Sequence, residues 1–223
     1  MRYMLLFWIG FMALGSCQNS TLPEGFSNID DYLPDLVVEL RYATDQNFMG
    51  RKVVGYDQPQ VVLTTDCLKA LKEVQKELYT MGLGLKLFDG YRPQKAVNDF
   101  MQWATQAGDT LTKRQYYPDL AKSTLFEAGY IAERSGHSRG STVDITLIYR
   151  QGPRKGQALD MGGPWDFFGP RSWFAHPELL PEQKRNRTLL KDIMHKHGFR
   201  PYSKEWWHFT LDNEPFPDTY FDF

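Results

Sequence analysis

The segment over residues 135–149 constrains this chain most, because it joins a glycine turn directly to a strand. Gly140 permits an unusual backbone conformation at the turn. Over residues 143–149 apolar and polar side chains alternate, which predicts a strand with core residues on one face and Asp144 on the other. Because His137 precedes the turn and Asp144 follows it, we expect these two side chains to converge on one point.

The rest of the pattern predicts one domain in which strands and helices alternate irregularly. No repeat or long linker interrupts residues 26–223, so a single domain is expected. Thr65 or Asp66 is the expected N-cap of a helix that ends near Gly82. Further helices are expected over residues 93–104 and 181–197, strands over 61–63, 85–88 and 205–211, and a long ordered loop over 152–174.

The composition excludes several classes of protein. The chain has 223 residues, of which 42% are hydrophobic, and a formal net charge of −1. Disorder requires low hydrophobicity with high net charge, and nucleic-acid binding usually requires a basic excess, so we expect neither. The two cysteines exclude a disulfide framework, and Cys67 lies on an amphipathic helix, which indicates a buried small apolar residue.

The N-terminus carries an export signal. Arg2 precedes an apolar run over residues 3–14, which is too short for a membrane span. The following Leu14-Gly15-Ser16-Cys17 resembles the bacterial lipobox, in which the cysteine is lipidated. We therefore expect a signal peptide over residues 1–16, a tether over 17–25, and a periplasmic protein held to a bacterial membrane only by its lipid. The alternative is a plain secretory signal with an incidental Cys17.

A second motif supplies further candidate metal ligands. His208 closes the sequence Glu205-Trp206-Trp207-His208. Two imidazoles and one carboxylate, from His137, His208 and Asp144, suit Zn²⁺ and leave a fourth position for water, as in catalytic zinc sites. Glu205 is then a spare carboxylate able to take a proton from that water.

Two reservations apply to this constellation. Residues three apart face opposite sides of an ideal strand, so Glu205 and His208 meet only if the backbone turns or bulges between them. A single histidine beside tryptophans is also more often a packed core or edge residue than a ligand. His195 and His197, near a helix C-terminus, are interpreted as structural, and His176 as a loop surface residue.

Several separated motifs resemble one peptidase family, in the same order along the chain. The motifs are Arg41-Tyr42-Ala43-Thr44, Asp89-Gly90-Tyr91-Arg92-Pro93, Ser135 to Asp144 around His137, Glu205 to His208, and Tyr220-Phe221-Asp222-Phe223. They resemble the D-alanyl-D-alanine dipeptidases of the VanX type, within the zinc peptidases that include lysostaphin and hedgehog-like domains. The similarity runs from about residue 28 to the C-terminus. Gly136 departs from the family pattern, which has a second serine there.

The resemblance implies an α+β fold with a small, mainly antiparallel sheet and packed helices. It implies one zinc ion per chain on His137, Asp144 and His208, with Glu205 as the catalytic base. It further implies that Arg92 stabilises the transition state. For Arg92 the alternative is a helix N-terminal arginine paired with a surface carboxylate.

The resemblance also implies the residues that bind substrate. Asp166 is the expected partner of the substrate's ammonium group, and Tyr42, Tyr56 and Ser135 are expected pocket contacts. The alternatives are an Asx turn at Asp166 and core packing for both tyrosines. The side chains expected to fix His137 and Asp144 by hydrogen bonds are Ser138, Arg139 and Ser141.

The predicted function is zinc-dependent hydrolysis of the D-alanyl-D-alanine dipeptide. One alternative is a D,D- or L,D-carboxypeptidase that trims peptidoglycan stem peptides and leaves the amine side of its pocket open. The other is a lipid-anchored, non-catalytic binding protein that keeps the metal for ligand capture or structure. The expected partner is thus a small dipeptide, no nucleic-acid partner is expected, and no oligomeric state is predicted.

Overall fold

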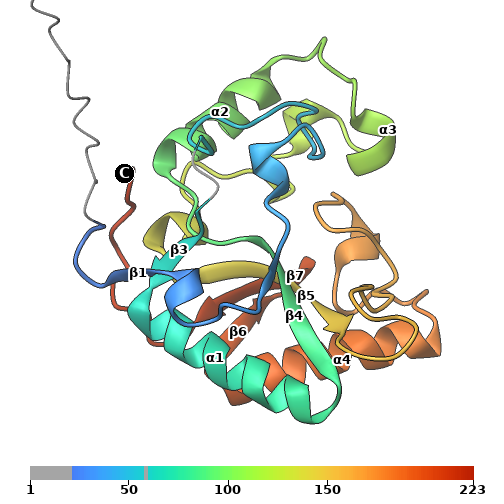
Figure 1. The fold of residues 1–223 in the computed structure, drawn as a ribbon. Helices are drawn as coiled ribbons and strands as arrows, with labels where there is room; N and C mark the ends of the chain where they lie inside the picture. The colour runs from blue at the N-terminus through green and yellow to red at the C-terminus, as the bar shows by residue number, and fades with distance from the viewer. Residues whose placement is uncertain (1–21, 58–59) are drawn as a thin grey trace, which may run out of the picture.

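The computed structural model describes residues 22–57 and 60–223 of the chain (Figure 1). The expected signal peptide and lipid-bearing Cys17, with most of the tether, lie outside these residues and stay predictions. No helix within the described part of the chain is long and apolar enough to cross a membrane.

A five-stranded sheet forms the centre of the molecule, in the order β2-β4-β5-β7-β6. Only the β2–β4 pair is parallel, and the other neighbours are antiparallel. The five strands are β2 (Val37–Val38), β4 (Leu83–Asp89), β5 (Thr142–Tyr149), β6 (Phe199–Tyr202) and β7 (Glu205–Leu211). A second, antiparallel pair joins β1 (Phe26–Asn28) to β3 (Val62–Thr64). The predicted α+β class with a small, mainly antiparallel sheet is confirmed.

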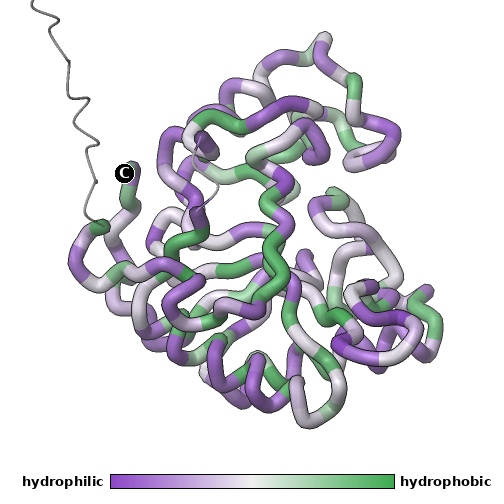
Figure 2. The backbone as a smooth tube through the Cα atoms, viewed as in Figure 1, coloured by the Kyte–Doolittle hydropathy of each residue, from purple (hydrophilic) through white to green (hydrophobic). Residues whose placement is uncertain are grey.

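Two of the long helices pack on this sheet and touch each other, through Lys196 and Glu77. The helices are α1 (Thr65–Thr80), α2 (Gln94–Thr105), α3 (Lys113–Tyr116) and α4 (Pro181–Lys196). Helix α1 packs on β4 and α4 on β6, while α2 and α3 lie together at the opposite end of the view in Figure 1. Figure 2 shows hydrophilic and hydrophobic residues alternating along α1, as an amphipathic helix on a sheet requires.

The N-cap of helix α1 lies one residue earlier than expected. The side chain of Thr64 accepts the hydrogen bond from the Cys67 N–H, so Thr64 is the N-cap in place of Thr65 or Asp66. Cys67 is fully buried, as its place on the apolar face predicted. Burial raises the pKa of its thiol above the ordinary value, so the group is held as a neutral, apolar side chain.

Strand β5 differs from its prediction in one respect. Both of its faces are buried, including the face that carries Asp144 and Thr146. The loop after β5 first pairs with the edge of the strand, where the Leu159 N–H donates to the Leu147 carbonyl. Further along the loop, the Trp165 Nε1–H donates to Asp144 Oδ2 on the polar face. Asp144 therefore lies on the face opposite the core residues, as predicted, but that face is also buried inside the molecule.

The turn before β5 has the glycine conformation that the sequence indicates. A short 3₁₀ helix over Gly136–Arg139 is capped by Ser135, whose Oγ accepts from the His137 N–H. Gly140 then adopts φ of +80°, and a Cβ atom there would overlap the ring of Phe26. The turn therefore requires glycine, and it sets His137 directly beside the first residues of β5.

Candidate active site

Three ligand atoms converge where the turn, β5 and β7 meet. His137 Nε2 lies 3.2 Å and His208 Nδ1 lies 3.1 Å from Asp144 Oδ1, and the two ring nitrogens are 3.3 Å apart. Asp144 and His208 are direct partners in the antiparallel register of β5 and β7. The structure thus brings together the three residues that the sequence proposed as metal ligands.

The donor set fits a small divalent cation. Asp144 Oδ1 is buried and has no hydrogen-bond partner among the described residues, although both imidazoles lie beside it. His137 Nδ1 lies 2.8 Å from the Gly90 carbonyl, so this nitrogen donates its proton and Nε2 keeps a lone pair toward Asp144. Two nitrogens and one carboxylate oxygen are the ligands of a catalytic zinc site with an open position.

The side chains expected to fix the ligands do not contact them in the structure. Arg139 pairs with Glu214 at 2.6 Å, and Ser141 Oγ bonds Thr64 Oγ1 at 2.7 Å. Ser138 Oγ is buried without a hydrogen-bond partner in the part of the chain that the structure describes. The predicted hydrogen bonds from these three side chains to His137 and Asp144 are therefore not formed. The Gly90 carbonyl and the Trp165 indole N–H fill that role.

Glu205 lies beside the three ligand atoms without joining them. Its Oε2 is 3.4 Å from His208 Nδ1, and its side chain lines the same cavity. The register of β6 and β7 shifts between Pro201 and Tyr202, at the turn where β7 begins, so the strand there is not ideal. That irregularity removes the objection to a Glu205–His208 contact. Burial raises the pKa of Glu205 to about 7, although His208 opposes the shift.

Arg92 reaches the site from the loop before α2. Its guanidinium is 2.9 Å from Asp89 Oδ2 and 3.7 Å from Asp144 Oδ2, and it stacks over the ring of Tyr42 at 5.1 Å. Its carboxylate partner, Asp89, is completely buried rather than at the surface. Arg92 therefore presents a fixed positive charge to the cavity.

Asp89 is a site residue that the sequence reasoning missed. It accepts hydrogen bonds from the Tyr56 hydroxyl at 2.7 Å and from the Gly90 N–H at 3.0 Å, in addition to pairing with Arg92. Tyr56 is thus turned toward Asp89 and is not among the residues that line the cavity around His208, so the cavity gives its predicted substrate contact no support. The Asp89–Arg92 spacing, at the end of a strand, was the available signal.

Asp166 lies in the same cavity with one oxygen unused. It is 5% exposed, its Oδ1 accepts from the Tyr42 hydroxyl at 2.9 Å, and its Oδ2 is buried without a partner in the residues described. Its backbone adopts φ of +67°, which is uncommon for a residue other than glycine. Burial raises the pKa of Asp166 well above its ordinary value, so a nearby cation would be needed to favour its charged form.

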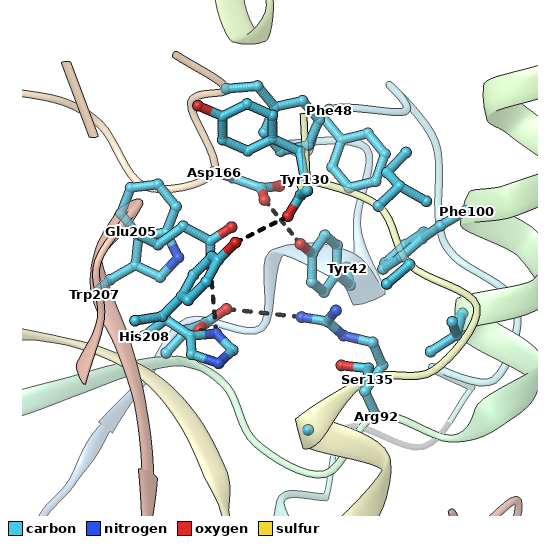
Figure 3. Close-up of a pocket in the computed structure, with 18 of the residues that line it drawn as sticks. Tyr42, Phe48, Arg92, Phe100, Tyr130, Ser135, Asp166, Glu205, Trp207 and His208 are labelled. Atoms are coloured by element: carbon cyan, nitrogen blue, oxygen red, sulfur yellow. Dashed lines mark hydrogen bonds and ion pairs between the residues drawn. The ribbon is translucent and has the colours of Figure 1, made fainter. Parts of the chain in front are cut away.

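The cavity that joins these groups has a volume of about 280 Å³. Aromatic side chains form much of its wall, and Ser135 lies at its edge. In Figure 3, Glu205, Trp207 and His208 line one side, Arg92, Tyr42 and Ser135 the other, and Asp166 lies between them beside Tyr130. The cavity therefore has the size for a small ligand and holds both acidic and basic groups.

A single-domain α+β fold with a candidate His, Asp, His ligand set and a separate carboxylate beside it is typical of metallopeptidases. Residues 23–223 match the peptidase family described as D-Ala-D-Ala dipeptidase, and the chain belongs to that family. It is therefore a peptidase, an enzyme of the hydrolase class.

Relatives support the same assignment over most of the chain. It is 42% identical over 199 residues to the D-alanyl-D-alanine dipeptidase of Enterococcus faecium, covering 89% of this chain and 97% of that protein. It is 36% identical over 178 residues to the D-alanyl-D-alanine dipeptidase of Escherichia coli, covering 80% of each. The solved structure of VanYB in complex with D-Alanine-D-Alanine is similar with 14% identity and a TM-score of 0.41, over 69% of this chain and 73% of that one.

Proposed function

We propose that this chain hydrolyses the free D-alanyl-D-alanine dipeptide to two D-alanines with the help of one zinc ion. The observation that carries the proposal is the unpartnered oxygen of Asp166, which faces the cavity that also holds Glu205 and His208. A buried carboxylate without a cation is costly, and a substrate ammonium group would supply the missing charge. The relatives named as D-alanyl-D-alanine dipeptidases support the choice of substrate.

The residues of the chain divide the work of hydrolysis among them. His137, Asp144 and His208 would hold zinc, which when bound lowers the pKa of a water molecule and adds positive charge beside the scissile carbonyl. Glu205, which lies beside the ligand atoms and lines the cavity, accepts the proton of the attacking water and then delivers it to the leaving amine. Arg92 faces the developing oxyanion with a charge already held in place by Asp89.

Two observations disfavour the alternative functions. A carboxypeptidase for stem peptides needs an open path on the amine side of the scissile bond, and there the buried Asp166 would face an uncharged peptide group. A protein that only binds a ligand has no need of Glu205, whose raised pKa suits proton transfer near neutral pH.

The proposal is tested by comparing two substrates on one purified sample. We expect D-alanine release from the free dipeptide to exceed trimming of a pentapeptide stem, measured as kcat/KM. Asp166→Asn should raise KM for the dipeptide about 30-fold or more, because losing a buried partner of a charge costs about 2 kcal/mol or more. Preferential trimming of the pentapeptide by the wild-type enzyme would contradict the proposal.

A further inference from the structure

The loop that carries Asp166 is fastened at both ends by one buried side chain of α4. Arg187 is 1% exposed. Its Nε donates to the Met161 carbonyl at 2.5 Å, its Nη1 to the Trp173 carbonyl at 2.6 Å and its Nη2 to the Arg171 carbonyl at 2.8 Å. Because Met161 precedes Asp166 and the other two carbonyls follow it, a single guanidinium ties together the two ends of the loop over residues 161–173.

Backbone carbonyls hold the Arg187 guanidinium. Within residues 22–57 and 60–223, no acidic oxygen lies within ion-pair distance of Arg187, and backbone carbonyls alone accept its protons. Burial lowers the pKa of Arg187 to about 10, helped by the nearby charge of Arg171. Burying an unpaired cation costs more than burying an apolar side chain. The planar fork of arginine fixes the positions of three carbonyls at once, which an apolar residue cannot do.

Neighbouring residues of α4 strengthen the same attachment. Gln183 Nε2 donates to Asp160 Oδ2 at 2.9 Å, and Asn186 Nδ2 donates to the Asp160 carbonyl at 2.8 Å. The first turns of α4 therefore hold the loop from outside the cavity. Asp166, in the middle of the loop, lines the cavity.

The middle of the loop makes contacts that need accurate placement. Trp165 donates to the metal-ligand candidate Asp144 at 3.3 Å, and Asp166 accepts from Tyr42. Asp166 also holds a φ of +67°, a strained conformation for a residue other than glycine, which persists only where the surroundings enforce it. The bonds from Arg187 to both ends of the loop are suited to enforce it.

We propose that Arg187 is a positioning residue for recognition of the substrate's ammonium group, which it achieves by fixing the loop that presents Asp166. The inference rests on the proposed dipeptidase function for the identity of the substrate. The attachment of the loop by Arg187 is independent of that function and can be measured separately.

The test compares Arg187→Lys with the control Arg185→Lys, an exposed position on the same helix. Lysine keeps the charge but lacks the fork that reaches three carbonyls. The substrates are D-alanyl-D-alanine and propionyl-D-alanine, which has the same skeleton without the ammonium group. For Arg187→Lys we expect KM for the dipeptide to rise about tenfold and kcat to fall less than about threefold, with KM for propionyl-D-alanine unchanged. The control should match the wild type on both substrates.

A merely structural role would give a different result. It would reduce turnover of both substrates in parallel, and that outcome would overturn the proposal. If Arg187→Lys does not yield folded enzyme, Asn186→Ala removes the bond to the Asp160 carbonyl, beside the Met161 end of the loop. This variant should shift the ratio of the two KM values in the same direction. An unchanged ratio in that variant would also reject the role of the attachment.

Amide hydrogen exchange separates this proposal from the proposed function. The Phe168 N–H donates to the Tyr116 carbonyl at 2.7 Å and the Gly162 N–H to Asp160 Oδ1 at 2.8 Å, so both report on the loop. Both should exchange faster in Arg187→Lys than in the control, while amides of β5 stay protected. Unchanged exchange would overturn the proposal, as would faster exchange without a change in the KM ratio. A wild-type enzyme inactive on the dipeptide would instead reject the proposed function, with the exchange result still testing the attachment.

Discussion

Glu205→Gln is expected to lower kcat for dipeptide hydrolysis by about a thousandfold, in the middle of the range for loss of a general base. Glutamine has nearly the same shape but cannot accept a proton from water at neutral pH. Because Glu205 lies 3.4 Å from His208 without belonging to the ligand set, zinc binding should be preserved. The measurement is steady-state kinetics on samples whose zinc content has been determined.

The matched control for this variant is Glu133→Gln, an exposed glutamate close in sequence to Ser135 at the cavity. The control should retain the activity of the wild type. A Glu205→Gln enzyme that is fully loaded with zinc and still turns over the dipeptide at the normal rate would show that proton transfer is assigned to the wrong residue.

Arg92→Ala should lower kcat by about 100- to 1000-fold, the usual cost of removing one fixed group that stabilises an oxyanion. KM should change only a few-fold, because the charge that develops on the carbonyl oxygen is largest in the transition state. Arg92 is held for this task by Asp89 and by stacking on Tyr42 and Phe100. The kinetic constants should be measured together with the free energy of unfolding, since the variant leaves Asp89 buried without its partner.

Arg92→Lys distinguishes charge from geometry at this position. Lysine can still pair with Asp89 but presents a point charge without the planar fork, so we expect kcat to recover only in part. A large increase in KM with unchanged kcat, in either variant, would mean that Arg92 binds the ground state of the substrate and has no special role in the transition state.

Local pattern and turn chemistry were sufficient to predict the elements nearest the site. Alternation placed β5 correctly, and the glycine at 140 correctly indicated a turn that brings His137 next to Asp144. The burial of Asp144 was not predictable in the same way. It depends on a loop about twenty residues further along the chain, whose Trp165 covers that face of the strand.

The remaining errors have the same physical origin. Tyr56 and Asp89 belong together only because the chain before β3 folds against the end of β4, a contact without a local pattern. Arg139 is drawn to Glu214, 75 residues away, rather than to its neighbours in sequence. The short strands β1 and β2 were also not predicted from the sequence.

The central claim is that His137, Asp144 and His208 share one zinc ion, and zinc stoichiometry tests it most directly. After removal of metal by a chelator and equilibrium dialysis against zinc, the wild-type chain and Glu205→Gln should each bind about one equivalent, as a three-ligand catalytic site predicts. His208→Ala, folded as judged by circular dichroism, should lose tight binding. Retention of one tightly bound zinc ion by His208→Ala and by Asp144→Ala would contradict the account.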